Sequence, residues 1–140
     1  MEHKMAVIGY GGMGSFHVTR IFDIIPSIKV VGIWDVQEER RNLAKSFGLI
    51  GYESLDECLA DPQTDLILVA TPNDYHKDLS IRALRAGKNV VCEKPVAMNL
   101  ADLKDMIAAS NRTGKIFTTH QNRRWDADFI MMRDVYNSGD

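Results

Sequence analysis

Glutamate, lysine and proline stand together at a point where a buried strand is expected to end. Residues 90–100 read VVCEKPVAMNL, so an apolar run leads directly into Glu93, Lys94 and Pro95. Charged groups are costly to bury unless they are paired or used in chemistry. Because Pro95 cannot prolong a strand and favours an extended residue before it, the Lys94 side chain should project beyond the strand end. Its ammonium could stabilise negative charge on a reacting oxygen, or it could simply pair with Glu93 at a solvated rim.

A glycine-rich turn precedes the first helix-like segment of the chain. Residues 6–16 read AVIGYGGMGSF and contain a GxGxxG pattern directly after an apolar run. The first glycine permits a tight turn, the second lets the backbone approach a pyrophosphate, and the third lets helix pack on strand. The helix N-terminus would add N–H groups and a positive dipole end for phosphates. The turn therefore predicts a dinucleotide site bordered by Gly9, Gly11, Gly12, Met13 and Gly14.

An acidic residue ends the second apolar run. Asp35 follows the last glycine of the pattern by 21 residues, at the position where a carboxylate can accept hydrogen bonds from ribose hydroxyls. The same carboxylate would repel a 2′-phosphate, so NAD is predicted in preference to NADP. The nearby Arg40 and Arg41 are interpreted as part of a solvated helix face that pairs with Glu38 or Glu39.

The third apolar run ends in ATPNDYH, residues 70–76. Pro72 should stop the strand, and Asn73 is expected to cap the helix that follows. Thr71, Pro72 and Asn73 are therefore expected to line the ligand crevice. His76 could face the nicotinamide end of a cofactor or could be an ordinary histidine in the first turn of a helix, and the sequence favours neither reading.

Strand-like and helix-like segments alternate along the chain. Short apolar runs rich in β-branched residues predict strands at 4–9, 28–35, 64–71, 89–93 and 115–120. Helices are predicted between them at 15–25, 37–47, 54–60, 74–86 and 100–112. This order implies right-handed crossovers and an α/β fold with a doubly wound parallel sheet, the Rossmann fold, which binds ligands at the carboxyl ends of its strands.

The bulk composition is that of one soluble globular domain. The chain has 140 residues, 45% of them hydrophobic, and a formal charge of −2, so no basic field would attract nucleic acid or a membrane surface. It has no apolar run that could span a bilayer and no signal-peptide pattern, and a cytoplasmic location is therefore expected. Cys58 and Cys92 fit reduced, buried thiols better than a disulfide, and no metal site is expected.

Together, GYGGMG, Asp35, ATPNDYH, EKP and HQNRRWDADF resemble the NAD(P)-binding domain of the Gfo/Idh/MocA oxidoreductase family over essentially all 140 residues. NRRWDADF is similar to a branch that includes scyllo-inositol dehydrogenases. The resemblance implies reversible hydride transfer between nicotinamide C4 and a hydroxyl-bearing ring carbon of a polyol or sugar, with Lys94 contacting the reacting oxygen. It also implies that the cofactor is bordered by Gly9, Gly11, Gly14, Asp35, Thr71, Asn73, His76 and Glu93.

Two departures from this family matter. NADP-using members of the branch lack an acid where Asp35 stands, so the prediction of NAD is kept. Family members also carry a second α/β domain, which covers the nicotinamide and supplies an Asp and a His around the substrate. Residues 1–122 are therefore interpreted as the dinucleotide-binding domain and residues 123–140 as the start of the connection to that second domain.

The NRRWD run follows the fifth predicted strand, which places Asn122 at the ligand-facing edge beside the cofactor. Arg123 or Arg124 could contact cofactor or substrate, or both could join the two domains by ion pairs. The complete protein is expected to be a homo-oligomer. Two other functions compete with a dehydrogenase: a non-catalytic NAD-binding regulator and an NAD-dependent glycosidase of the same family. Lys94 favours an enzyme over a regulator.

Overall fold

The protein is built around one parallel sheet. The computed structural model describes residues 2–139, apart from the side chains of residues 21–23. The sheet has six strands in the order β3-β2-β1-β4-β5-β6, and every neighbouring pair is parallel. The strands are β1 His3–Ile8, β2 Ile28–Trp34, β3 Ile50–Gly51, β4 Leu66–Val69, β5 Asn89–Cys92 and β6 Phe117–Thr119. This order confirms the predicted doubly wound Rossmann fold.

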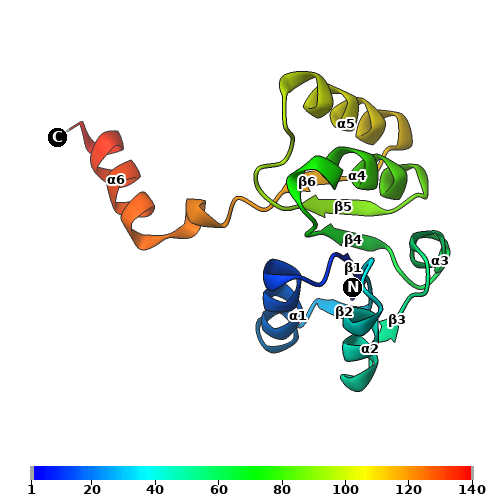
Figure 1. The fold of residues 1–140 in the computed structure, drawn as a ribbon. Coiled ribbons are helices and arrows are strands. Elements are labelled where there is room, and N and C mark those ends of the chain that lie inside the picture. Colours follow the sequence, from blue (N-terminus) through cyan, green and yellow to red (C-terminus); the bar gives the residue numbers. More distant parts are fainter. Residues whose placement is uncertain (1, 140) are drawn as a thin grey trace.

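Helices cover both faces of the sheet (Figure 1). They are α1 Gly12–Ile24, α2 Glu38–Ser46, α3 Leu55–Ala60, α4 His76–Arg85, α5 Leu100–Thr113 and α6 Ala127–Ser138, with 3-10 turns η1 Asn73–Tyr75 and η2 Asn122–Trp125. In Figure 1, α1 and α2 lie on one side of the strands, and α4 and α5 lie on the other. The helix α6 lies away from the sheet, beyond the end of β6.

Successive side chains of a buried strand point to opposite faces of the sheet. The strands therefore contribute to two cores, one under each helical layer. Met5 and Val7 of β1 join the core beneath α1 and α2, whereas Ala6 and Ile8 join the core beneath α3, α4 and α5. All four of these side chains are buried. Such strands read as continuous apolar runs because both of their faces are covered, and for this reason the sequence reveals them.

Capping side chains and left-handed glycines explain where several of the helices begin and end. The side chains of Ser54 and Asn99 accept hydrogen bonds from backbone N–H groups in the first turns of α3 and α5, at 3.1 and 2.9 Å. Gly87 and Gly114 have φ values of +80° and +66° and follow the last turns of α4 and α5. A left-handed residue at this position favours glycine, so the predicted ends of these two helices are confirmed.

Most element boundaries differ from the prediction by one or two residues, and three larger differences have a physical reason. Strand β3 was not expected, because two residues at a sheet edge are too few to show periodicity. The predicted helix over 74–86 is divided into η1 and α4, and Asn73 opens the 3-10 turn; the N-cap of α4 is Tyr75, which makes no side-chain capping bond, so the predicted cap is wrong. Helix α1 begins at Gly12, because the glycine pattern itself forms the first helical turn.

Both cysteines are free and buried, as predicted. Burial raises the pKa of the Cys58 thiol to about 12 and that of the Cys92 thiol to about 11. Within residues 2–139, no helix combines the length and the hydropathy that crossing a bilayer requires.

Candidate functional site

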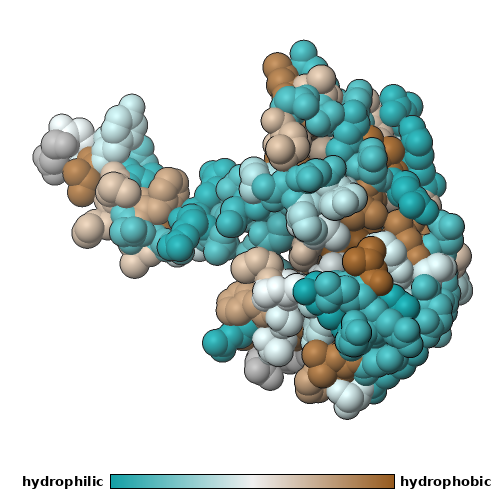
Figure 2. Space-filling view, in the orientation of Figure 1, coloured by the Kyte–Doolittle hydropathy of each residue, from teal (hydrophilic) through white to brown (hydrophobic). Residues whose placement is uncertain are grey.

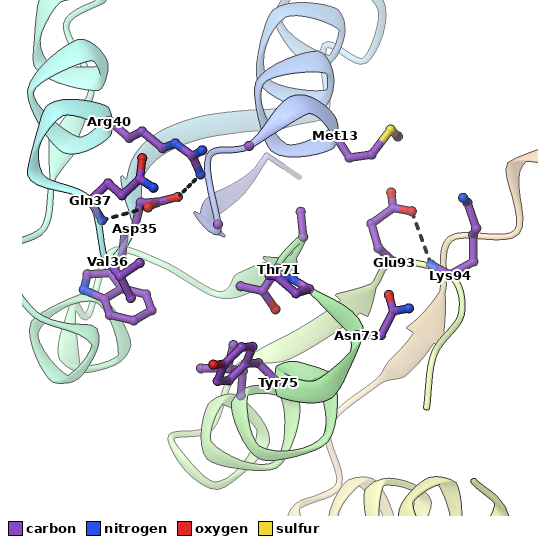
Figure 3. Close-up of a pocket in the computed structure, with 16 residues that line it drawn as sticks. Met13, Asp35, Val36, Gln37, Arg40, Thr71, Asn73, Tyr75, Glu93 and Lys94 are labelled. Carbon is purple, nitrogen blue, oxygen red and sulfur yellow. Dashed lines mark hydrogen bonds and ion pairs between the residues drawn. The ribbon is translucent and has the colours of Figure 1, made fainter. Parts of the chain in front are cut away.

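A pocket of about 680 Å³ opens at the carboxyl ends of the strands. It lies where the strand order reverses, between β1 and β4, which is the ligand site expected of open α/β sheets. Asp35 and Arg40 lie at one end of the pocket, Glu93 and Lys94 at the other, and Thr71 between them (Figure 3). One cavity therefore joins the predicted ribose site to the predicted catalytic lysine.

A side chain would clash with the fold at two glycines of the turn but not at a third. A Cβ on Gly9 would lie 2.8 Å from the Ala70 carbonyl oxygen, and a Cβ on Gly14 would lie 2.0 Å from that of Gly9. The fold itself thus excludes side chains at these two positions. A Cβ on Gly11 would have a single heavy atom within 4 Å, Arg40 Nη1 at 3.7 Å. Protein packing does not demand glycine at position 11, which lines the pocket, so the space left there is available to a ligand.

The carboxylate of Asp35 is fixed by its own chain. It is 3% exposed, and it accepts hydrogen bonds from the Tyr10 N–H at 2.8 Å and the Gln37 N–H at 2.9 Å. Arg40 Nη1 donates to Oδ2 at 3.2 Å. These contacts hold an anionic group at the end of the pocket, oriented by backbone donors.

The placement of Arg40 and Arg41 corrects the prediction that they form a solvated face paired with Glu38 or Glu39. Arg40 lines the pocket beside Asp35, and the Arg41 guanidinium donates to the Asp35 carbonyl oxygen at 2.8 Å and pairs with Glu53. Both side chains reach back from the first turn of α2 to the strand end. Spacing along a helix does not reveal this direction, because it depends on the turn between β2 and α2.

At the opposite end of the pocket, Glu93 is held by two histidines. It is 4% exposed, and its Oε1 lies 2.5 Å from His17 Nε2 and 2.9 Å from His120 Nδ1. Its Oε2 accepts the Lys94 N–H at 3.2 Å. Burial raises the pKa of this carboxyl, but the hydrogen bond from His17 and the charges of both imidazoles outweigh burial, so the pKa lies below its ordinary value.

Lys94 therefore does not neutralise Glu93 with its side chain. Among the described residues, no ion pair joins the Lys94 ammonium to a carboxylate, and the side chain lines the pocket. Figure 3 shows the ammonium pointing away from the Glu93 contact, which is made by the backbone. Of the two readings of this lysine, the one that pairs it with Glu93 lacks the expected ion pair among the described residues, although Lys94 is exposed as that reading expected.

His76 does not reach the pocket. It is 0% exposed, and its ring nitrogens contact the Pro95 and Thr71 carbonyl oxygens at 3.0 and 2.9 Å. The prediction that it borders a cofactor is therefore not supported by its placement. The imidazole instead links the segments that follow β4 and β5, which carry pocket-lining Thr71 and Lys94. Its sequence position in the first turn of α4 could not distinguish these two roles.

Of the other predicted site residues, some line the pocket and some do not. Met13, Thr71, Pro72, Asn73 and Glu93 line the pocket, whereas Gly12, Gly14 and Asn122 are not among its lining residues. Thr71 Oγ1 is buried and has no hydrogen-bond partner in the described part of the chain, which leaves a polar atom of a pocket-lining residue for a ligand to satisfy. Asn122 is the first residue of η2, which follows β6 along the chain, and Arg123 of the same turn pairs with Asp126 at 2.8 Å.

The sequence analysis missed His17 and His120. His17 lies four residues after Met13 and thus on the same face of α1, and His120 directly follows β6, as Glu93 directly follows β5. His17 thus shares the helix face of Met13, and His120 shares with Glu93 a position directly after a strand, so the same reasoning could have identified both as candidate site residues. What the sequence does not show is that the two rings meet at one carboxylate, because 76 and 27 residues separate them from Glu93.

Comparisons with known proteins agree with this geometry. A family model described as an oxidoreductase family with an NAD-binding Rossmann fold matches residues 3–121. The myo-inositol 2-dehydrogenase of Thermotoga maritima is 33% identical over 97% of this chain and 41% of its own length. The chain thus spans about two fifths of the length of curated relatives that it matches.

Two solved structures are similar over 99% of the chain. An NAD-binding protein from Listeria innocua has a TM-score of 0.94 and 45% identity, and the match covers 41% of its chain. The WlbA dehydrogenase from Bordetella pertussis, solved with NADH and UDP-GlcNAcA, has a TM-score of 0.93 and 26% identity over 43% of its chain.

Proposed function

The chain belongs to the Gfo/Idh/MocA family of oxidoreductases, and on this premise we propose that its pocket binds NAD for hydride transfer to or from a sugar or cyclitol. One observation carries the proposal: a fixed carboxylate and a lysine with no ion pair among the described residues stand at opposite ends of a single pocket that crosses a glycine turn. The reaction would take place at a carbon that bears a hydroxyl group. When bound, the nicotinamide would supply the hydride acceptor or donor.

The pocket residues fit a dinucleotide in three places. The open space at Gly11 and the N–H groups of the first turn of α1 can receive a pyrophosphate. Asp35 can accept hydrogen bonds from ribose hydroxyls, because backbone donors orient its carboxylate without occupying every lone pair. Thr71 Oγ1 offers a buried polar atom that no group of residues 2–139 with a described side chain satisfies.

The proposed role of Lys94 is to hydrogen-bond the oxygen of the reacting carbon. In the reduction direction the carbonyl carbon accepts hydride and negative charge develops on its oxygen, and a nearby ammonium stabilises that charge. The Lys94 backbone is anchored by Glu93 Oε2, and Glu93 is in turn held by His17 and His120. The side chain is thereby left for the substrate.

Gly11→Ala should separate binding from folding. The added methyl group meets no atom closer than 3.7 Å, so the free energy of unfolding is expected to change by less than about 0.5 kcal/mol. NADH affinity is expected to fall by about tenfold or more, because the methyl group fills space that the proposed pyrophosphate needs. Fluorescence titration with NADH and urea unfolding measure the two effects.

Gly14→Ala is the matched control, because its methyl group would lie 2.0 Å from the Gly9 carbonyl oxygen. It should destabilise the fold by about 1–3 kcal/mol or more. Unchanged NADH affinity in a stable Gly11→Ala protein would contradict the placement of the pyrophosphate.

We also propose that residues 1–122 form the cofactor domain and that residues 123–140 lead into a second domain that completes the substrate site. Support comes from the chain's two-fifths share of its relatives' length and from α6, where Phe129, Met131, Met132 and Val135 are exposed. Figure 2 shows α6 as an arm with hydrophobic patches that stands apart from the body.

The 140-residue chain should accordingly bind NADH without oxidising polyols. Its sheet, its helical layers and its two cores have the features of an independent folding unit, so we expect this chain to bind cofactor without further residues. The measurement is NADH formation from NAD and myo-inositol or related polyols by the purified chain. Turnover at about 1 per second or faster would show that no second domain is required. With the complete enzyme, net NADH formation distinguishes a dehydrogenase from a glycosidase, which would return the hydride within one turnover.

A further inference from the structure

Three side chains with metal-binding atoms meet at one point beside the pocket. His17 comes from α1, Glu93 from the end of β5 and His120 from the residue after β6. Their ligand atoms all lie within 4.8 Å of one another. The two imidazole rings stand at 76° with their centroids 4.5 Å apart, and each directs a nitrogen toward Glu93 Oε1. These residues are called the His17–Glu93–His120 cluster below.

We propose that the His17–Glu93–His120 cluster binds a divalent transition-metal ion, with Zn²⁺ as the best match to its ligands. Two imidazole nitrogens and one carboxylate are a common set of protein ligands for a zinc ion that keeps an open coordination position. One carboxylate against a doubly charged ion leaves the site with a net positive charge, which water or a small anion at the open position can offset. This proposal does not depend on the proposed dehydrogenase function.

The geometry requires only small movements. The present separations of 2.5 and 2.9 Å are hydrogen-bond lengths. Ligand atoms about 2.0–2.2 Å from a tetrahedral zinc ion lie roughly 3.3 Å from one another, so each nitrogen must move by less than about 1 Å relative to Oε1. A neutral imidazole carries one proton, which has to reside on the ring nitrogen that faces away from the ion. The steep angle between the rings allows both to point at a common centre without contact between their planes.

Burial of the cluster favours a specific site with a route of entry. The side chains of His17 and Glu93 are 9% and 5% exposed, so these two ligands are held rigidly by the surrounding fold. The His120 side chain is 31% exposed, which leaves the cluster open toward solvent on one side. Glu93 also lines the pocket, next to Lys94. An ion held here would therefore stand at the pocket wall, one residue from the proposed catalytic lysine.

The test uses the 140-residue chain without any histidine tag, titrated with Zn²⁺ alone and with Co²⁺ alone. We expect saturable binding of one ion per chain and, for Co²⁺, visible absorption bands typical of four- or five-coordinate nitrogen and oxygen ligation. His120→Phe should weaken binding by about tenfold or more and remove the bands. This variant replaces a partly exposed side chain, so the fold should persist, and circular dichroism checks that it does.

His3→Gln is the matched control. His3 Nδ1 lies 2.5 Å from Asp65 Oδ2, which makes it another histidine–carboxylate pair of this chain, but no third ligand of the same kind completes a cluster there among the described residues. Its binding curve should coincide with that of the unmodified chain. Equal affinity in His120→Phe, loss of binding in His3→Gln, or no saturable binding below about 100 μM would each overturn the proposal. NADH titration of the same proteins tests the cofactor pocket separately.

Discussion

Replacing Lys94 with alanine in the complete enzyme is expected to lower kcat/KM by about a hundredfold or more, equivalent to roughly 2.7 kcal/mol of lost transition-state stabilisation. The lysine is unpaired within the described chain and lines the pocket opposite Asp35, so its loss removes a charge that the reacting oxygen needs only as negative charge develops. NADH affinity should change little. Steady-state kinetics with deuterated substrate, together with NADH titration, measure the two effects.

Two further variants sharpen this prediction. Lys94→Arg keeps the positive charge but replaces a compact ammonium with a longer planar group, so most of the activity should still be lost. Lys104→Ala removes an exposed lysine of α5 that does not line the pocket, and its kinetics should match those of the unmodified enzyme. If Lys94→Arg retained most of the rate while hydride transfer remained rate-limiting, specific lysine chemistry at the end of β5 would have to be abandoned.

Asp35→Ser should reduce the preference for NADH over NADPH by about 1–3 kcal/mol, or roughly 5- to 150-fold. Two effects act together here. The substitution removes a carboxylate that would repel a 2′-phosphate. It also releases Arg40, a pocket-lining residue whose Nη1 donates to Asp35 Oδ2 at 3.2 Å in the unmodified chain. A freed guanidinium at this position can bind a phosphate through paired hydrogen bonds.

The double variant Asp35→Ser with Arg40→Ala separates these two effects. It removes the repulsion but also the new phosphate ligand, so NADPH should gain less affinity than in the single variant. Calorimetric or fluorescence titration with both cofactors provides the comparison. Equal affinity of the unmodified chain for NADH and NADPH would contradict the role proposed for Asp35 at the ribose.

Features that depend on short stretches of sequence were predictable. The buried strands are recognisable in the sequence as apolar runs. Gly9 and Gly14 are required by close contacts with residues a few positions away or just after the adjacent strand. Because carboxyl ends of parallel strands share one edge of a sheet, Asp35, Thr71 and Lys94 could be placed around one crevice from their strand positions alone.

Features that depend on side-chain direction were not predictable. Arg40 turns back toward the strand it follows, His76 points inward to two carbonyl groups, and His17 crosses to a residue 76 positions away. Each outcome is decided by which atoms surround the side chain after the helices have packed on the sheet. Residue type and spacing constrain the backbone position of such a residue, but not the atoms that the end of its side chain contacts.

The burial of both cysteines has a practical consequence for watching this fold open. Thiolates react with alkylating reagents, and thiols with pKa values of about 11 and 12 form almost none at neutral pH. Cys58 lies in α3 and Cys92 in β5, in two elements of the same core. Labelling of the intact protein must therefore await transient exposure of that core, and the rate at which each thiol is modified measures the local opening of α3 and of β5.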